Sequence, residues 1–156
     1  MKSLFEICTP RDDILEGRIK ESDFAADLAL ILGDSSDAPR EYRDAPTFFA
    51  NTYPTEGLKA LLKNVCQRLS GNGGEAASVF RLDTQYGGGK THALIALLHV
   101  AQGMDGVNGV DEFVDPKLLP KSGIRVAAFD GENADPTNGR LMGDNVRAFT
   151  PWGELA

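Results

Sequence analysis

A glycine-rich stretch at residues 84–91, with the sequence Thr-Gln-Tyr-Gly-Gly-Gly-Lys-Thr, constrains the fold more than any other feature of this chain. It follows the apolar run 78–82 and leads into the helical run 92–98. Strand, glycine loop, Lys-Thr and helix is the order of a phosphate-binding P-loop. Glycine allows a close backbone approach to an anion, and a helix N-terminus carries about half a positive charge. The predicted nucleotide-binding residues are Gly87, Gly88, Gly89, Lys90 and Thr91.

Two of these residues have separate predicted roles. The ammonium group of Lys90 reaches the β- and γ-phosphates of a nucleotide, and the Thr91 hydroxyl ligates Mg²⁺. The loop departs from the common pattern G-x-x-x-x-G-K-[ST] at its first position, where Thr84 replaces glycine. The alternative interpretation is a glycine-rich turn between a strand and a buried helix, but it explains neither Lys90 nor Thr91.

The charge, the cysteines and the apolar runs of the chain argue against several classes of protein. The formal net charge of −7 argues against sequence-independent nucleic-acid binding, which needs a basic surface. Cys8 and Cys66 are isolated and signal neither a zinc site nor a disulfide framework. No run approaches the roughly 20 apolar residues of a membrane span, and the N-terminus lacks the apolar core of a signal peptide. We therefore expect a cytoplasmic protein without membrane contact.

The chain divides into two predicted parts. Residues 1–76 are expected to form an N-terminal, mostly helical segment with loops, and residues 77–156 to begin an α/β core. The expected elements of the first part are extended chain over 1–20, a helix over 23–32 capped by Ser22, a short helix from Pro46, and a helix from the cap Thr55 to about Leu69.

The second part reads as the start of a P-loop NTPase core of three layers. Its expected elements are a strand over 78–83, the loop, a helix over 90–102 and a strand over 124–130. A parallel sheet buried on both faces needs more than two strands. Four apolar residues at the end of the chain have the spacing of an amphipathic helix just beginning: Val146, Phe149, Trp152 and Leu155. We therefore expect the core to be incomplete and the chain to be part of a longer protein.

Several stretches, in the same order, resemble the N-terminal part of a prokaryotic P-loop ATPase family catalogued as domain of unknown function 499. These stretches are residues 10–17, 24–28, 41–44, 48–58, 87–92 and 152–156. The run Gly-Gly-Gly-Lys-Thr-His, which ends at His92, is more specific than a bare P-loop. With the resemblance His92 joins the predicted nucleotide-binding residues. Its alternative interpretation is an imidazole that is packed or exposed on the first helical turn.

The resemblance implies a large cytoplasmic ATPase with an AAA+-like fold that uses ATP and Mg²⁺. Such proteins sit beside DNA methyltransferases and helicases in phage-defence gene clusters, so DNA or one of these enzymes is an expected partner of the full-length protein. In folds of this type the second strand lies at the sheet edge, so strands 78–83 and 124–130 are not expected to pair. Arg140 and Arg147 have two interpretations: charge-stabilising fingers in a homo-oligomer, or ordinary surface arginines.

Two further groups of residues each have two interpretations, one functional and one structural. The run 126–132 resembles a Walker B strand, in which Asp130 holds Mg²⁺ through water and Glu132 acts as a base. Alternatively Asp130 only ends a strand, because the resemblance places the true Walker B on a later strand. Phe48, Phe49, Thr52 and Tyr53 precede the loop, and they either contact the nucleotide base or pack in the core.

The leading functional hypothesis is an ATP-binding N-terminal part of a P-loop ATPase that couples ATP binding and hydrolysis to a DNA-related process such as phage defence. Little hydrolysis is expected from this chain by itself, because the catalytic base and sensor residues are not identifiable in it. The alternative is a nucleotide-gated interaction module for a DNA-modifying partner, with little hydrolysis of its own. A third hypothesis, a small-molecule kinase, calls for an arginine-rich lid that the sequence does not show.

Overall fold

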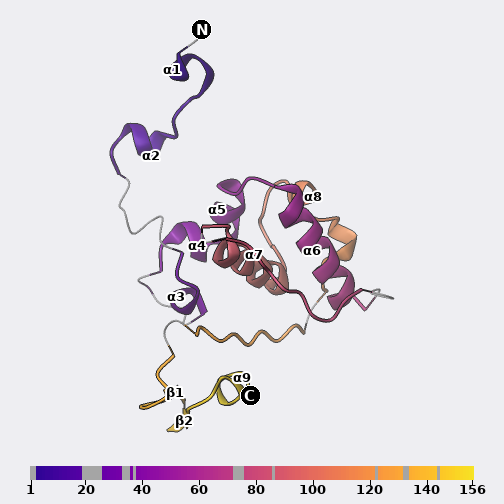
Figure 1. Ribbon diagram of the computed structural model, residues 1–156. Coiled ribbons are helices and arrows are strands. Elements are labelled where there is room, and N and C mark those ends of the chain that lie inside the picture. The colour runs from indigo at the N-terminus through magenta and orange to yellow at the C-terminus, as the bar shows by residue number, and fades with distance from the viewer. Residues whose placement is uncertain are drawn as a thin grey trace.

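The computed structural model describes residues 3–18, 26–32, 36, 38–71, 76–85, 87–121, 123–131, 134–143 and 145–156 (Figure 1). The longest helices are α6 (Glu56–Leu69) and α7 (Lys90–Gln102), which pack against each other. The shorter helices α5 (Ala45–Ala50) and α8 (Val110–Phe113) flank this pair. The hydrophobic core therefore lies between helices.

Local sequence explains where the two central helices begin and end. Thr55 is the N-cap of α6, and its hydroxyl accepts a hydrogen bond from Leu58 N at 3.2 Å. Leu58, Leu62 and Cys66 recur every four residues and form its buried face. Helix α7 is bounded by glycines in the left-handed conformation, Gly89 at its start and Gly103 at its end.

The core unites residues from both predicted parts of the chain. Its fully buried side chains include Leu62 and Cys66 of α6 and Ile95 and Val100 of α7. Phe48 and Phe49 of α5 are also buried, and their rings lie edge to face at a centroid distance of 5.2 Å. The division near residue 76 remains a prediction.

Shorter elements surround this core. They are α1 (Leu4–Ile7), α2 (Asp12–Leu15), α3 (Leu28–Leu32), α4 (Arg40–Arg43) and the 3₁₀ helix η2 (Pro116–Leu118). Helix α3 contacts α7, whereas η2 contacts α6. Helices α1 and α2 lie apart from the central helices at the N-terminal end (Figure 1). The described residues contain no helix that combines the length and apolarity needed to cross a membrane.

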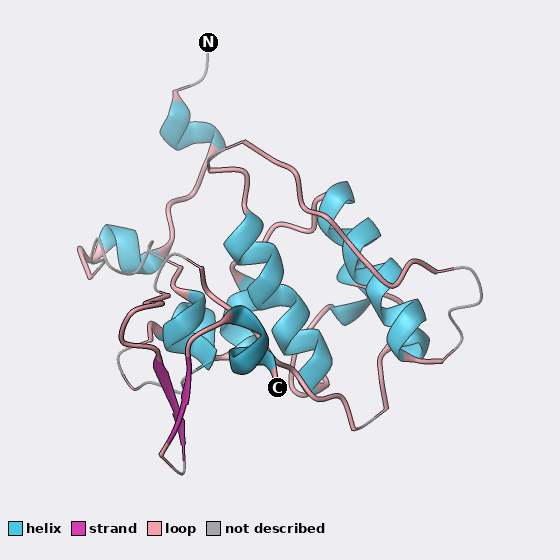
Figure 2. Ribbon diagram, turned by 60° about the horizontal axis from the view of Figure 1, so that its bottom comes forward, coloured by secondary structure: helices cyan, strands magenta, loops and turns pink. Residues whose placement is uncertain are grey.

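The sheet is a two-stranded antiparallel hairpin near the C-terminus (Figure 2). Strand β1 (Arg140–Gly143) pairs with β2 (Val146–Ala148), and Leu141 lies opposite Arg147. The turn between them includes Asn145, whose φ of 61° is a left-handed conformation that asparagine tolerates. Helix α9 (Pro151–Leu155) follows and contacts β2.

The helix predictions for α5, α6 and α7 are confirmed, but three other predictions are wrong. Residues 78–83 and 124–130 form no strand, because within the described ranges neither segment pairs with another strand. A strand assignment requires ladder hydrogen bonds, which apolar alternation does not supply. The N-terminal 20 residues are not simply extended, because residues 4–7 and 12–15 each close a helical turn.

The third wrong prediction concerns the C-terminal amphipathic helix. Val146 lies in β2 instead, and the helix begins only at Pro151, after the cap Thr150 accepts a hydrogen bond from Gly153 N. Proline is favoured in the first turn of a helix, which fixes this start. Helix α3 begins at Leu28, later than predicted, and Ser22 and residues 23–25 lie outside the described residues.

The coarse α/β class agrees with a chain of helices and one small sheet. The finer prediction, a three-layer P-loop NTPase core, is taken up below as a proposal.

Candidate functional site

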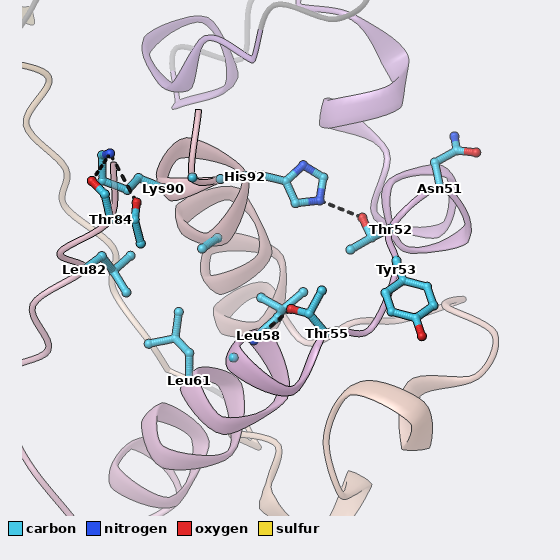
Figure 3. A pocket seen from close by; sticks show the side chains of 14 residues that line it. Asn51, Thr52, Tyr53, Thr55, Leu58, Leu61, Leu82, Thr84, Lys90 and His92 are labelled. Atoms are coloured by element: carbon cyan, nitrogen blue, oxygen red, sulfur yellow. Dashed lines mark hydrogen bonds between the residues drawn. The ribbon is translucent and has the colours of Figure 1, made fainter. Parts of the chain in front are cut away.

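A pocket of about 420 Å³ lies where the glycine loop meets the start of α6 (Figure 3). One side is formed by Thr84, Gly88, Gly89 and Lys90, and the opposite side by residues of the segment 51–55. Leu58 and Leu61 of α6 complete it from below in this view. The full lining consists of Asn51, Thr52, Tyr53, Thr55, Gly57, Leu58, Leu61, Leu82, Thr84, Gly88, Gly89, Lys90, His92 and Ala93.

The backbone of the loop requires glycine at two positions. Gly87 and Gly89 have φ values of 77° and 74°, which lie in the left-handed region that favours glycine. Gly89 is the N-cap of α7, so the loop leads directly into the first helical turn. The N–H groups of that turn have no acceptor within the helix and carry its positive dipole.

The side chain of the exposed residue Lys90 folds back over the loop. Its Nζ donates to Thr84 O at 3.0 Å, to Gln85 O at 3.1 Å and to Thr84 Oγ1 at 3.3 Å (Figure 3). A cation in the first turn opposes the helix dipole, so its position at this pocket favours an anionic ligand.

His92 joins the loop helix to the opposite wall. Its Nε2 lies 2.9 Å from Thr52 Oγ1 (Figure 3). Its ring also stacks on Phe48 at a centroid distance of 4.5 Å. Burial lowers the pKa of His92 below its ordinary value of 6.5. The neutral imidazole therefore acts as a packed connector between α7 and the chain before α6, in agreement with the packed alternative.

The rest of the pocket is mostly apolar. Leu58, Leu61, Leu82 and Ala93 line it, and the ring of Tyr53 stands at its edge with 81% of the residue exposed. Among the described residues that line the pocket there is no carboxylate, and the charged side chain is that of Lys90. The pocket thus offers a cation and a loop backbone beside an apolar surface.

The residues upstream of the loop are predicted either to contact the nucleotide base or to pack in the core, and they do not all behave alike. Phe48 and Phe49 are 1% and 2% exposed, so for these two the core interpretation is correct. Thr52 and Tyr53 line the pocket. Sequence reasoning missed the contributions of Leu61 and Leu82, because their apolar spacing alone matches an ordinary core face.

The structure brings only some of the predicted site residues together. Gly88, Gly89, Lys90 and His92 line the pocket, whereas Gly87 and Thr91 belong to the same loop and first turn but do not line it. Asp130 is not among the lining residues, and the chain just before it, residues 125–128, lines a different groove with β1 and α9. Glu132 lies outside the described residues. The roles given to Thr91, Asp130 and Glu132 remain predictions.

The two arginines discussed for an oligomer contact the C-terminal region. Arg140 Nη1 lies 3.3 Å from Glu154 Oε2, which joins β1 to α9. Arg147 Nη1 donates to Asn138 O at 2.6 Å and to Gly139 O at 3.1 Å. Both side chains therefore have intramolecular partners.

The fold and the pocket define a class: a mainly helical domain in which a glycine loop at a helix N-terminus lines a pocket with a lysine. The family model of the DUF499 N-terminal domain matches residues 4–119, which contain every residue that lines this pocket. The match covers well over half of the chain, and the chain belongs to the DUF499 family. No curated protein and no solved structure shows significant similarity to the chain.

Proposed function

We propose that this pocket binds ATP together with Mg²⁺, and that the chain is the ATP-binding N-terminal part of a P-loop ATPase. One observation carries the proposal: the glycine loop, Lys90 and an apolar wall of α6 line a single pocket. A triphosphate needs backbone N–H groups and a cation, whereas a nucleobase needs apolar surface. The pocket supplies both kinds of surface.

Each element of the site has a defined task in this proposal. The N–H groups of the loop and of the first turn of α7 bind the phosphates, and Lys90 Nζ binds the terminal ones. The base lies against the apolar side chains of Leu58, Leu61 and Leu82. Thr91 presents a hydroxyl from the same turn, which fits a magnesium ion that takes most of its ligands from phosphates and water. The bound ion neutralises phosphate charge.

Hydrolysis and its coupling to a DNA-related process, such as phage defence in the cytoplasm, extend the proposal to the full-length protein. The resemblance of the loop and its flanking stretches supports an AAA+-like ATPase with a three-layer core. Positioning and electrostatic stabilisation by the loop amides and Lys90 supply most of the rate in this chemistry. A DNA methyltransferase or helicase is the partner that the resemblance suggests.

Calorimetry with Mg-ATP tests the binding step. We expect wild-type protein to bind and the Lys90→Ala variant to bind at least about tenfold more weakly, since a hydrogen bond to a charged group contributes roughly 1.5–3 kcal/mol. Lys117→Ala is the matched control, because Lys117 is an exposed lysine of η2 that does not line the pocket. Absence of binding by folded wild-type protein would refute the proposal.

A second function is favoured by the composition of the pocket wall. Within the described part of the chain, no carboxylate lines the pocket, and a carboxylate is the usual base or water-positioning group near a terminal phosphate. A nucleotide-gated interaction module, which binds ATP and hardly hydrolyses it, fits this wall. Steady-state turnover decides: clear hydrolysis by the purified chain that depends on Lys90 contradicts the module and brings Asp130 and Glu132 back as catalytic candidates.

A further inference from the structure

The glycine loop departs from the common P-loop pattern at its first position, and the structure connects this position to the glycine at the fifth. In G-x-x-x-x-G-K the first position is glycine and the fifth is free. In this chain the first position is Thr84 and the fifth is Gly88. The first position therefore carries a side chain, and the fifth position carries none.

Steric contact explains why Gly88 is glycine. Unlike Gly87 and Gly89, Gly88 does not have a positive φ, so its backbone conformation is open to other residues. A Cβ built on Gly88 would lie only 2.6 Å from Thr84 Cβ and 2.9 Å from Gln85 O. Both distances are far below van der Waals contact, so the Thr84 side chain occupies the space that a residue at position 88 would need.

The Thr84 hydroxyl also takes part in holding Lys90. An ammonium group has three hydrogens, and Lys90 Nζ has three acceptors in the loop. Two of these are the carbonyl oxygens of Thr84 and Gln85, which any residue would supply. The third is Thr84 Oγ1 at 3.3 Å, which glycine at the first position would not supply.

We propose that Thr84 is a positioning residue for Lys90, and that Gly88 is its steric counterpart. The Thr84 hydroxyl accepts a hydrogen bond from the ammonium group and holds it against the loop. Because Gly88 has no side chain, the Thr84 side chain fits beside it. The inference rests on the proposed nucleotide site for its functional consequence, but the two contacts belong to the loop itself.

The hydroxyl is tested by two substitutions at the same position. Thr84→Val keeps the branched shape and removes the hydroxyl, whereas Thr84→Ser keeps the hydroxyl. We expect Val to weaken Mg-ATP binding roughly five- to tenfold, and Ser to remain within about twofold of wild type. Equal affinities of the Val and Ser variants, or tighter binding by Val, would overturn the positioning role.

A second measurement compares the chemical reactivity of the Lys90 amine in the absence of nucleotide. Brief acylation of the intact chain, read by peptide mass spectrometry, reports how freely each lysine reacts. Removal of the hydroxyl in Thr84→Val should raise the rate at Lys90 about twofold or more, while Thr84→Ser leaves it unchanged. Lys117 is the internal control. An unchanged rate at Lys90 in the Val variant argues against the proposal.

The steric pairing is tested with a double-mutant cycle read by thermal unfolding. In the Thr84 background Gly88→Ala should lower the melting temperature by roughly 3–10 °C, and in the Thr84→Gly background by less, because only the contact with Gln85 O remains. An equal shift in both backgrounds would contradict the pairing.

The outcomes separate this inference from the proposed function. If wild-type protein does not bind Mg-ATP, the proposed function fails, and acylation and the thermal cycle still decide the pairing of Thr84 with Lys90 and Gly88. If wild-type protein binds Mg-ATP and Thr84→Val has no effect on affinity or acylation, the positioning role fails alone.

Discussion

At the scale of single residues, the Thr52 hydroxyl determines which ring nitrogen of His92 carries the hydrogen. A threonine hydroxyl has one hydrogen, which Thr52 donates to Phe48 O at 2.7 Å. It must therefore accept from His92, so the hydrogen of His92 is on Nε2. This pair of bonds fixes the first turn of α7 to the chain that precedes α6, and thus holds the two walls of the pocket together.

Removal of this hydroxyl should destabilise the protein. We expect Thr52→Val to lower the free energy of unfolding by about 1–3 kcal/mol, because Phe48 O keeps only the donor Asn51 N and the half-buried His92 loses its acceptor. Urea denaturation measures the change. Thr52→Ser retains the hydroxyl and is the control. Equal stability of the Val and Ser variants would show that the hydrogen bonds contribute nothing net.

The two histidines predict how stability changes with pH. Burial lowers the pKa of His92 and of His99 below the ordinary 6.5, although for His99 a hydrogen bond with Tyr42 and the charge of Asp44 oppose the shift. Below pH 6.5 the unfolded chain therefore binds more protons than the folded chain. The free energy of unfolding should be highest above that pH and decrease as the pH falls toward the lowered values.

Urea denaturation at about pH 7.5 and about pH 5.5, on either side of the ordinary histidine pKa, checks the sign of this effect. His92→Gln keeps an N–H donor near the position of Nε2 for Thr52 and has no group that titrates in this range, so its stability should depend less on pH. Stability that rises on acidification would contradict the assignment of both imidazoles as neutral in the folded protein.

At the scale of elements, the sequence predicts best where local chemistry decides. The cap Thr55, the spacing of Leu58, Leu62 and Cys66, and the loop before Lys90 are local signals, and α6 and α7 begin where they indicate. Strand pairing depends on distant segments, and in the described structure no other strand pairs with residues 124–130. The sequence predicts the loop side of the pocket but not its apolar side. No local pattern shows that Leu61 and Leu82 line the same pocket as Lys90.

The packing of α6 on α7 supports the pocket, so a cavity in it should be costly. Leu62 is 0% exposed in the core, and Leu62→Ala should lower the free energy of unfolding by about 2–5 kcal/mol. Leu141→Ala is the matched control, since Leu141 of β1 is 60% exposed and its truncation should change stability by about 0.5 kcal/mol or less. Similar losses in both variants would mean that α6 and α7 do not form the core in solution.

At the scale of the whole molecule, the proposed site gathers segments that are far apart in the sequence. Residues 51–61 and 82–93 supply its two walls, and both lie within the stretch that matches the DUF499 N-terminal domain. The chain has a net charge of −7, yet the charged side chain in the pocket is the cation Lys90. A local positive site in an acidic protein favours a compact anion over the extended backbone of a nucleic acid.

Amide hydrogen exchange with and without saturating Mg-ATP tests this claim most directly, because it locates the ligand on both walls at once. We predict slower exchange at residues 88–93 and, in the same experiment, at residues 51–61, with no change at residues 140–148 of the hairpin. At a Mg-ATP concentration that just saturates wild-type protein, Lys90→Ala should weaken both effects. Slower exchange at the glycine loop without any effect on 51–61, or no protection at all, would contradict a nucleotide held between these two walls.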